Sequence, residues 1–502
     1  MNARARRGRV VLLSLVAGVL LALSLPPWGW WPLGLAGAAL LYWRLAGLRA
    51  RARLWSGWLA GVGCYGPGLM WARAFNWYGA LLLILLEALF FGLAGLLTPP
   101  LRGRAPAFVA ASTLAEAVRM TWPFGGLPIG GVFLGQADGP LLALARLGGP
   151  LLLTAGVWAG GVGLATVVTG WRRGREGRPQ LRGLAIVVGL GLVIVVGWLA
   201  PDGGSPVRSL TVAAVQGGGR RGLDKEQVAP ATVFDAQVRA TRNLLLRGGT
   251  PRPSLVLWPE DVIALAGPLR GSGEGQTMAR AARQLHATLI AGVTEPASPT
   301  TFRNEIVAWA PDGRIVGSFE KVHRVPFGEY VPFRSFMAHF ANLSEVPTDA
   351  VPGHGSGLLR TPAGPLGTLV SFEVFYANRS RTSVRAGAEL LIVPTNTSSY
   401  ATGQVPSQEV AADAVQAVET GRDLVQAAPT GYSTVVDQRG VVRRRSVLGR
   451  SQVLVATVSL RRGFTIYDHL GDLPTLVVAV PVLGAGWLRR RRAAGRPVAV
   501  HS

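Results

Sequence analysis

The chain has 502 residues, of which 49% are apolar, and its mean hydropathy is +0.32. It carries 51 lysines and arginines against 27 aspartates and glutamates, a formal net charge of +24 at pH 7. This length allows two or more domains. The apolar residues come in blocks, which excludes a single soluble domain and indicates a membrane protein with a soluble part.

Eight apolar blocks have the composition of membrane-spanning helices, and most approach the roughly 17–25 residues that such a helix needs. The first and fifth are short, and the sixth contains Gly148, Gly149 and Pro150 near its start, so its beginning is uncertain. LSLPPWGWW after the first block is a poor cleavage site, so we expect a retained anchor rather than a signal peptide. The predicted spans are residues 10–25, 31–47, 53–71, 80–97, 107–122, 146–169, 182–200 and 472–488.

The placement of the arginines predicts membrane orientation rather than nucleic-acid binding. They gather in both tails and in alternate loops, which the positive-inside rule assigns to the cytoplasm. With eight spans both termini lie inside, and residues 201–471 lie outside the cytoplasm. The clusters are Arg4, Arg6, Arg7 and Arg9; Arg44, Arg49, Arg51 and Arg53; Arg102 and Arg104; Arg172, Arg173, Arg175, Arg178 and Arg182; and Arg489 to Arg492.

The sequence offers no sign of a metal or cofactor site. Its one cysteine, Cys64, lies in the third predicted span, where we expect a small apolar core residue rather than a nucleophile. One cysteine forms no internal disulfide. The six histidines are scattered and there is no cysteine pair, which argues against a metal site. No glycine-rich motif follows a strand as nucleotide binding requires.

Residues 201–471 alternate strands with helices and hairpins, which predicts an α/β domain with buried sheets. Expected strands are residues 210–216, 255–260, 288–293, 367–374 and 388–396. Expected helices are residues 228–247, 276–287 and 405–420. Expected hairpins are residues 305–321 and 424–442.

Polar residues stand where several of these strands end, namely Glu260, Lys321, Ser371 and Asn396. Sites in α/β proteins favour that edge of the sheet. Singly, each residue could instead be a helix cap, a solvated tip or a turn residue. Lys321 stands out because the chain otherwise uses arginine for positive charge, and Lys225 is its only other lysine. A buried lysine can have a shifted pKa, so Lys321 is a candidate for a chemical role.

Three motifs in this order resemble the Glu–Lys–Cys arrangement of the nitrilase superfamily: WPE at 258–260, EKVHRVPFGEYVPF at 320–333 and SFEV at 371–374. Because they lie between seven predicted spans and an eighth, the chain resembles the apolipoprotein N-acyltransferase family. Further similarity extends over nearly the whole chain, in EAVRMTWPFGGLPIGGVFLGQADGP (116–140), VQGG (215–218) and IYDHLGDLP (466–474).

The resemblance implies a domain organisation and a location. Residues 1–200 would form a transmembrane domain of seven spans, and residues 201–471 an extracytoplasmic nitrilase-like αββα sandwich. Residues 472–502 would form the last span and a basic cytoplasmic tail. The protein would lie in the plasma membrane of a bacterium. It would transfer an acyl chain from a membrane phospholipid to the α-amine of the N-terminal diacylglyceryl-cysteine of lipoproteins, without a cofactor.

The resemblance also implies residue roles. Glu260 would be the general base, and Lys321 would stabilise the oxyanion together with a backbone N–H near Phe372. Glu329 and Glu373 would be supporting acids of the site.

The sequence departs from the family pattern in three places. Ser371 stands where the family has its nucleophilic cysteine. After the supporting residue Asn396, the family's usual tryptophan is replaced by TSSY at 397–400, and Gly218 stands where an asparagine is expected.

Aromatic side chains gather at the predicted outer ends of the spans. They suit the interfacial level, where the acyl carbonyl of a phospholipid lies, either as an aromatic belt or as substrate contacts. They are Trp28, Trp30, Trp31, Trp71, Phe75, Trp77 and Tyr78.

A serine nucleophile raises a chemical problem. A thiol is readily deprotonated, whereas a serine hydroxyl usually needs a histidine or a neutral lysine as its base. Three functions therefore stay open: an N-acyltransferase that uses Ser371, an inactive relative that binds lipid or lipoprotein, and a membrane-bound amidase or hydrolase. A neutral Lys321 could activate Ser371 directly, and His323 is expected to position the loop.

Overall fold

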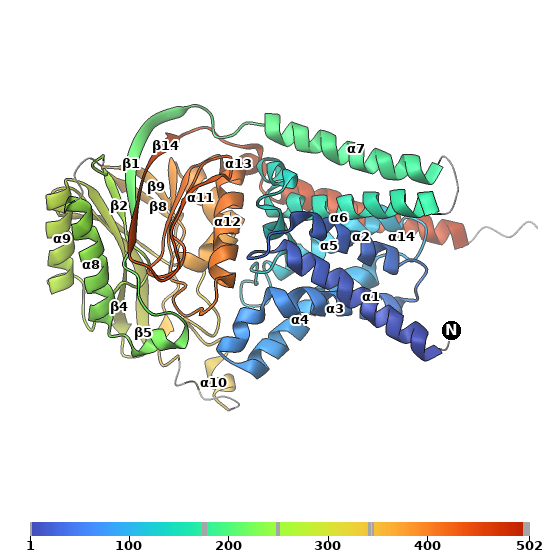
Figure 1. Ribbon diagram of the computed structural model, residues 1–502, viewed down its shortest axis with the longest axis horizontal. Coiled ribbons are helices and arrows are strands. Elements are labelled where there is room, and N and C mark those ends of the chain that lie inside the picture. Colours follow the sequence, from blue (N-terminus) through green and yellow to red (C-terminus); the bar gives the residue numbers. More distant parts are fainter. Residues whose placement is uncertain (1–2, 173–177, 247–250, 340–342, 344–345, 495–502) are drawn as a thin grey trace, which may run out of the picture. The chain divides into compact units, whose positions relative to one another are not determined.

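The structure is a computed structural model that describes residues 3–172, 178–246, 251–339, 343 and 346–494. The chain divides into two compact units (Figure 1). One consists of Met1–Ala200 together with Leu470–Ser502, and the other of Pro201–His469. We call them the helical unit and the α/β unit, and each is described by itself.

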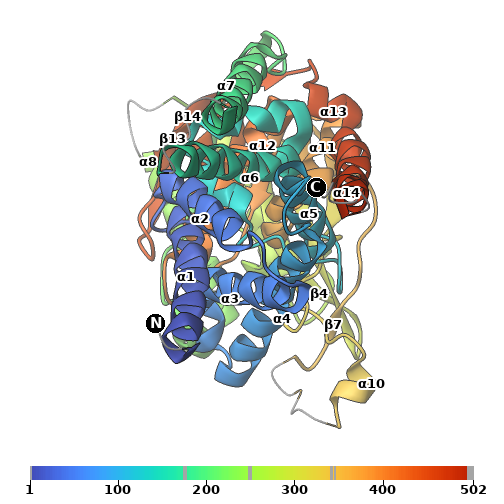
Figure 2. The same cartoon turned by 90° about the vertical axis from the view of Figure 1, so that its right-hand side faces the viewer.

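In the described part of the helical unit, one long helix overlaps each predicted span. Figure 2 shows this unit from one end, with α14 beside α5. Short 3-10 helices lie between some of the long helices: η1 (Met70–Ala74), η2 (Val132–Gln136) and η3 (Pro140–Leu144). The long helices are α1 (Ala3–Ser24), α2 (Trp31–Arg44), α3 (Ala50–Gly68), α4 (Trp77–Leu97), α5 (Arg104–Arg119), α6 (Ala145–Arg172), α7 (Arg178–Leu199) and α14 (Leu473–Ala494).

Among the described residues of this unit, three stretches are by length and composition able to cross a membrane: Trp77–Leu97, Pro140–Gly170 and Gln180–Leu199. The expected irregularity at the start of the sixth span is present, because Gly148 and Gly149 have non-helical backbone angles inside α6. Proline has no N–H to donate, and it follows this break at position 150.

Small residues let the helices of this unit approach closely. A Cβ atom on Gly61 of α3 would lie 2.6 Å from the Cα of Ala88 on α4, and one on Gly95 would lie 2.6 Å from the carbonyl oxygen of Arg53. Such contacts between small residues are typical of helices packed in membranes.

A buried ionic network ties α4 and α5 to the loop that follows α5. The guanidinium group of Arg119 is fully buried and donates two hydrogen bonds to Glu116, at 2.9 and 2.7 Å. It also contacts the carboxylate of Glu87 at 3.2 Å and donates to the carbonyl oxygens of Leu127, Pro128 and Ile129. A buried arginine needs such partners, because an unpaired buried charge is strongly destabilising.

The α/β unit contains two sheets in its described residues. The first has the order β14-β1-β2-β4-β5-β6, with β3 beside β4 and β7 beside β5, and the second has the order β13-β12-β11-β10-β9-β8. The first is made of β1 (Pro206–Gln216), β2 (Leu255–Leu257), β3 (Ile263–Ala264), β4 (Thr288–Ser298), β5 (Thr301–Trp309), β6 (Ile315–Glu320), β7 (Asp349–Ala350) and β14 (Gln452–Arg461). The second is made of β8 (Leu358–Thr361), β9 (Gly364–Thr368), β10 (Leu390–Pro394), β11 (Leu424–Ala427), β12 (Thr434–Val436) and β13 (Val442–Arg445).

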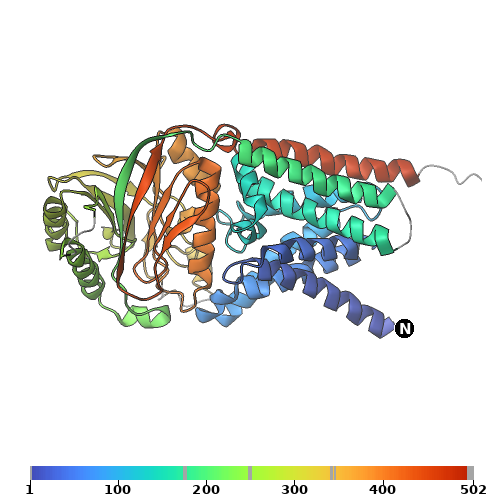
Figure 3. The same ribbon diagram turned by 45° about the horizontal axis from the view of Figure 1, so that its top comes forward.

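The sheets face each other and helices cover their outer faces, giving four layers (Figure 3). Along β1 the side chains alternate: Val212 and Ala214 belong to the core between the sheets, whereas Ala213 and Val215 belong to the core under the helices of the first sheet. Those helices are α8 (Pro230–Leu246) and α9 (Gly273–Leu285). The second sheet is covered by α11 (Ala377–Arg385) and α12 (Gln404–Thr420). The predicted α/β domain with buried sheets is confirmed.

One predicted strand ends earlier than expected, with a consequence for the site. Residues 367–374 were expected as a continuous strand, but β9 ends at Thr368 and the 3-10 helix η5 (Ser371–Phe375) follows. Val370 is still extended, and the chain turns at Ser371, whose φ of +50° is incompatible with a continuing strand. The helix expected at 228–247 corresponds to α8, and residue 247 lies outside the described part. The sequence reading missed α11, which directly follows η5.

We predict that the C-terminal end of α12 is sensitive to an added methyl group. Gly421 caps this helix with φ +62°, and its Cβ would lie 2.5 Å from the carbonyl carbon of Asp202. Gly421→Ala should therefore cost about 1–3 kcal/mol, which lowers the apparent Tm by about 5 °C in a tryptophan-fluorescence melt. Gly267→Ala, which meets no atom within 4 Å, is the matched control. Equal melting temperatures for the two variants would contradict this account.

Candidate active site

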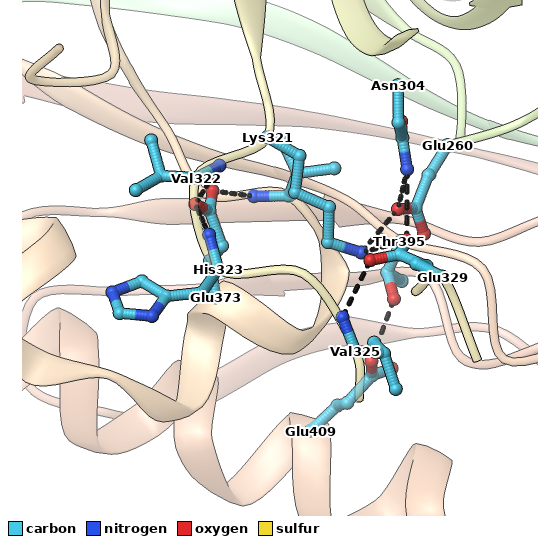
Figure 4. Close-up of polar contacts among 11 residues, drawn as sticks. Glu260, Asn304, Lys321, Val322, His323, Val325, Glu329, Glu373, Thr395 and Glu409 are labelled. Carbon is cyan, nitrogen blue, oxygen red and sulfur yellow. Dashed lines mark hydrogen bonds and ion pairs between the residues drawn. The ribbon is translucent and has the colours of Figure 1, made fainter. Parts of the chain in front are cut away.

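The centre of the site is a lysine held between two carboxylates (Figure 4). Lys321 directly follows β6, and its Nζ donates to Oε1 of Glu260 at 2.8 Å and to Oε1 of Glu329 at 2.7 Å. Asn304 on β5 donates from Nδ2 to the same two oxygens, at 2.9 and 3.1 Å. The structure thus brings three of the predicted residues into one cluster. It adds Asn304, which the sequence reading missed because nothing marks an asparagine inside a strand.

The Lys321 ammonium group is almost fully buried and stays charged. Burial by itself lowers its pKa, but the adjacent carboxylates of Glu260 and Glu329 outweigh that effect and raise the pKa well above its ordinary value. A protonated lysine is a hydrogen-bond donor and a positive charge, not a base. The hypothesis that a neutral Lys321 activates Ser371 is therefore disfavoured.

The two carboxylates differ in how their oxygens are used. In Glu329, Oε1 accepts from Lys321 and Asn304, while Oε2 accepts from the backbone N–H of Val325 at 2.7 Å. In Glu260, Lys321 and Asn304 both donate to Oε1. No other described residue donates a hydrogen bond to its Oε2, so this oxygen can accept a proton.

The turn that carries Glu260 is held tightly against the neighbouring strand. The N–H of Gly292 on β4 donates to the carbonyl oxygen of Pro259 at 2.9 Å, and a Cβ atom on Gly292 would collide with the Glu260 Cα. Glycine at 292 is thus required for this close approach.

Ser371 stands at a sharp turn between β9 and η5. It is buried, and its φ of +50° places a non-glycine residue in the left-handed region, which usually costs free energy. Such a turn separates a side chain from the strand that precedes it, as a nucleophile requires. In the described part of the chain its hydroxyl makes no hydrogen bond, either to Glu260 or to Lys321.

Glu373 fixes the position of this turn. Its Oε2 accepts from the N–H of Val370 at 2.9 Å, and its Oε1 accepts from the N–H groups of Val322 and His323 at 2.9 and 3.0 Å. Burial raises its pKa above the ordinary value, while Arg379 and these N–H groups oppose the rise. One carboxylate therefore joins the Ser371 turn to the segment that directly follows Lys321.

The other predicted residues lie beside this cluster. The ring of Phe372 is buried against Phe375 and Tyr376. The side chain of Asn396 accepts from the N–H of Ser398 at 3.1 Å in a local turn. The ring of His323 stacks on Tyr376 at 4.1 Å, and burial, followed by the charge of Arg379, lowers its pKa to about 4. His323 is thus neutral at pH 7 and positions the loop.

Comparison with known proteins decides the family. A family described as the apolipoprotein N-acyltransferase N-terminal domain matches residues 17–163, and the carbon-nitrogen hydrolase family matches residues 251–463. An apolipoprotein N-acyltransferase of Mycolicibacterium smegmatis is 34% identical over 496 residues, covering 92% of this chain and 82% of the relative. The protein of the same name from Azotobacter vinelandii is 29% identical over 519 residues, covering 97% and 96%.

The chain belongs to the apolipoprotein N-acyltransferase family. Its α/β unit is the nitrilase-like part. Among solved structures, the nitrilase-superfamily protein Nit3 of Saccharomyces cerevisiae is 19% identical with a TM-score of 0.39, covering 52% of this chain and 93% of its own. A carbon-nitrogen hydrolase of Helicobacter pylori is 16% identical with a TM-score of 0.39, covering 57% and 95%.

A fourth carboxyl group, missed in the sequence reading, belongs to the surroundings of this N-acyltransferase site. Glu409 on α12 is buried, and its Oε1 accepts from the hydroxyl of Thr395 at 2.7 Å (Figure 4). Burial, followed by the charge of Glu260, raises the pKa of Glu409 to about 8, although Thr395 opposes the rise. One signal for it was present, because Glu409 and Asp413 are four residues apart and share a face of α12.

In the described part of the chain, the side chains that commonly bind metals do not gather into a metal centre. Among the described residues, no group of three or more histidine, cysteine, aspartate or glutamate side chains could hold a metal ion. The positive charge next to Glu260 is that of Lys321.

We predict that Glu409 makes the stability of the protein depend on pH. The folded chain keeps a proton on Glu409 up to about pH 8, whereas the unfolded chain releases it near pH 4.5. By linkage, the free energy of unfolding falls as pH rises through this window. Glu409→Gln removes this dependence. The urea midpoint of the variant minus that of wild type should therefore increase between pH 4.5 and pH 8 and stay constant above pH 8.

The measurement is a series of urea unfolding curves between pH 4.5 and pH 9. Glu274→Gln, at the start of α9, is the control and should not change the pH profile. A difference between Glu409→Gln and wild type that is the same at every pH would refute the assignment.

Proposed function

We propose that the protein is an N-acyltransferase that moves an acyl chain from a membrane phospholipid, through an ester on Ser371, to the α-amine of a diacylated lipoprotein. One observation carries the proposal: Lys321 is held charged by Glu329 and by one oxygen of Glu260, while the other oxygen of Glu260 is left to accept a proton. The family membership supplies the substrate class. No cofactor takes part.

In the acylation step, the base, the nucleophile and the oxyanion donors have separate roles. Glu260 takes the hydroxyl proton as Ser371 Oγ forms a bond to the acyl carbon. Lys321, with the backbone N–H of Phe372, stabilises the negative charge on the acyl oxygen. When the bond to the glycerol oxygen breaks, the lysophospholipid leaves with the proton from Glu260.

The transfer step runs the same groups in reverse. The α-amine of the lipoprotein attacks the Ser371 ester and forms an amide bond, and Glu260 takes a proton from the nitrogen. The bond from the acyl carbon to Ser371 Oγ breaks, and Glu260 returns the proton to this oxygen. Water in place of the amine would make the protein a hydrolase.

A second candidate function rests on a specific observation. The Ser371 hydroxyl makes no hydrogen bond to Glu260 in the described residues, as expected for an inactive relative that binds lipid or lipoprotein. Hydrogen bonds of catalytic groups are often long before substrate binds, so this geometry alone does not remove the enzyme hypothesis. The third candidate, an amidase or hydrolase, differs in its acceptor.

The membrane arrangement is part of the proposal. The eight long helices of residues 1–200 and 473–494 would all cross the plasma membrane of a bacterium, with both termini in the cytoplasm and residues 201–471 outside it. The family membership, three apolar stretches of sufficient length, and arginines at alternate helix ends support this arrangement.

We predict that incubation with phospholipid leaves an acyl group on Ser371. The protein is purified in detergent, incubated with phosphatidylethanolamine and digested, and the peptide that contains Ser371 is weighed by mass spectrometry. The adduct should be absent in Ser371→Ala and in Glu260→Gln, because they lack the nucleophile and the base. Lys321→Met should slow its formation by about 10²-fold or more, because the oxyanion loses its positive charge.

The acceptor then separates the candidate functions. Addition of a diacylated lipopeptide should discharge the adduct with N-acylation of the peptide. Discharge by water alone indicates a hydrolase. No adduct in wild type, together with an adduct in Ser371→Cys, would mean an intact pocket without a working nucleophile.

We also predict on which side of the membrane two exposed positions lie. In a Cys64→Ser background, a cysteine at Ser298 in the α/β unit should react with a membrane-impermeant maleimide in intact spheroplasts. A cysteine at Leu101, beside Arg102, should react only after permeabilisation. Both side chains are exposed, so accessibility reports the side of the membrane. The reverse pattern would overturn the topology.

A further inference from the structure

The helical unit contains a cavity of about 570 Å³ that the acyl-transfer chemistry does not use. It lies among α5, α6, α7 and α14, and Thr113 and Thr475 are its only lining residues with a polar side chain. Five alanines make room for it: Ala105, Ala110, Ala155, Ala159 and Ala479. We call it the α5/α14 groove. All of its lining residues belong to the helical unit, so it is distinct from the Lys321 cluster.

Helix contacts explain why this space stays open. Near one end α14 touches α5, since a Cβ atom on Gly103 would lie 2.5 Å from the carbonyl oxygen of Gly486. Near the other end α14 approaches the break in α6, since a Cβ atom on Gly148 would lie 3.1 Å from Oγ1 of Thr475. Between these contacts the helices carry small side chains that do not fill the gap.

The shape and lining fit a hydrocarbon chain. Beyond the break in α6 the lining residues run from Leu152 to Val162, about 15 Å at 1.5 Å per residue. This matches the roughly 15 Å of hydrocarbon in one leaflet, so an acyl chain fits lengthwise. A compact polar ligand would need several placed hydrogen-bonding groups, which this lining does not offer.

Positive charge lies at one end of the groove. Arg102 and Arg104 directly precede the lining residue Ala105, and Arg182 on α7 lies one helical turn before the lining residue Ile186. Arg102 and Arg182 are exposed. The Arg104 guanidinium does not point to the groove, because it stacks on the ring of Tyr42 on α2, 4.1 Å from the ring centre. The flanking segments 98–106, 178–190 and 478–494 contain no acidic residue, so the arginines have no carboxylate within these segments.

We propose that the α5/α14 groove binds a phospholipid of the cytoplasmic leaflet. One acyl chain fills the groove, and the phosphate contacts Arg102 and Arg182. The proposal rests on the membrane orientation given above. This lipid is a resident ligand that fills the space between α14 and α6, and it is separate from the acyl donor at Ser371. Apolar burial and phosphate pairing together favour an anionic lipid.

The test is native mass spectrometry of the full-length protein, delipidated in detergent and then incubated with palmitoyl-oleoyl phosphatidylglycerol. Wild type should retain one lipid. Ala155→Phe and Ala159→Phe fill the groove and should lower retention of the lipid by about tenfold or more. Excluding two methylenes of the acyl chain from the groove already weakens binding by about tenfold. The matched control is Leu192→Phe. The side chain of Leu192 on α7 is 62% exposed, so this variant should behave as wild type.

The arginines give a second arm. Arg102→Gln together with Arg182→Gln should reduce phosphatidylglycerol retention several-fold. If the arginine variants lose phosphatidylglycerol but Ala155→Phe and Ala159→Phe retain it, the proposal is overturned. That result would mean a headgroup contact without an acyl chain in the groove. Equal retention in all variants would overturn it as well.

A measurement on wild type covers the case in which the filled variants do not fold. Phosphatidylglycerol with a diazirine in its acyl chain should cross-link to peptides of α6 and α14 that include residues 152–162 and 474–482. Cross-links confined to the outer face of α7 would refute the site. Neither readout uses acyl transfer, so failure here is distinguishable from failure of the Ser371 adduct test.

Discussion

The site depends on one interaction, the ammonium group of Lys321 held between the carboxylates of Glu260 and Glu329. Taking such charges out of water is costly, and removing one partner of a buried pair typically costs several kcal/mol. The fold offsets this cost with further hydrogen bonds, from Asn304 to both carboxylates and from the Val325 N–H to Glu329. The cluster therefore requires β2, β5, β6 and the 325–330 turn to be in place together.

This arrangement assigns different tasks to groups of the same type. Glu329 uses both oxygens in hydrogen bonds, whereas one oxygen of Glu260 accepts none from the described residues, and the proposed function rests on this difference. Glu373 has a third task, since it joins the segment after Lys321 to the strained turn of Ser371. The serine is thus held by the same framework that would hold a cysteine, and the difference lies in the reactivity of the hydroxyl.

The helical unit follows other rules. Its helices approach through glycine and alanine, and its buried arginine, Arg119, is neutralised by acids from two helices. Where small residues do not meet a partner, as on α5, α6 and α14, they leave the groove that we assign to a lipid. The same residue types therefore produce close contacts in one place and a binding space in another.

Much of this protein was determined by its sequence. Apolar blocks located the eight long helices, short apolar runs located most strands, and a rare lysine between two motifs marked Lys321. These features are local, because hydrophobic period and composition depend on near neighbours. Roles and membrane sidedness stay predictions.

Only the tertiary structure decided the rest. Asn304 has no distinctive sequence surroundings, and Glu409 has only another acid four residues on. They matter because strand pairing and helix packing bring them beside Glu260 and Thr395. The turn that follows β9 depends on one backbone angle at Ser371, which an apolar run does not encode. The charge on Lys321 is decided by two carboxylates 61 and 8 residues away in sequence, because a pKa depends on distance in space.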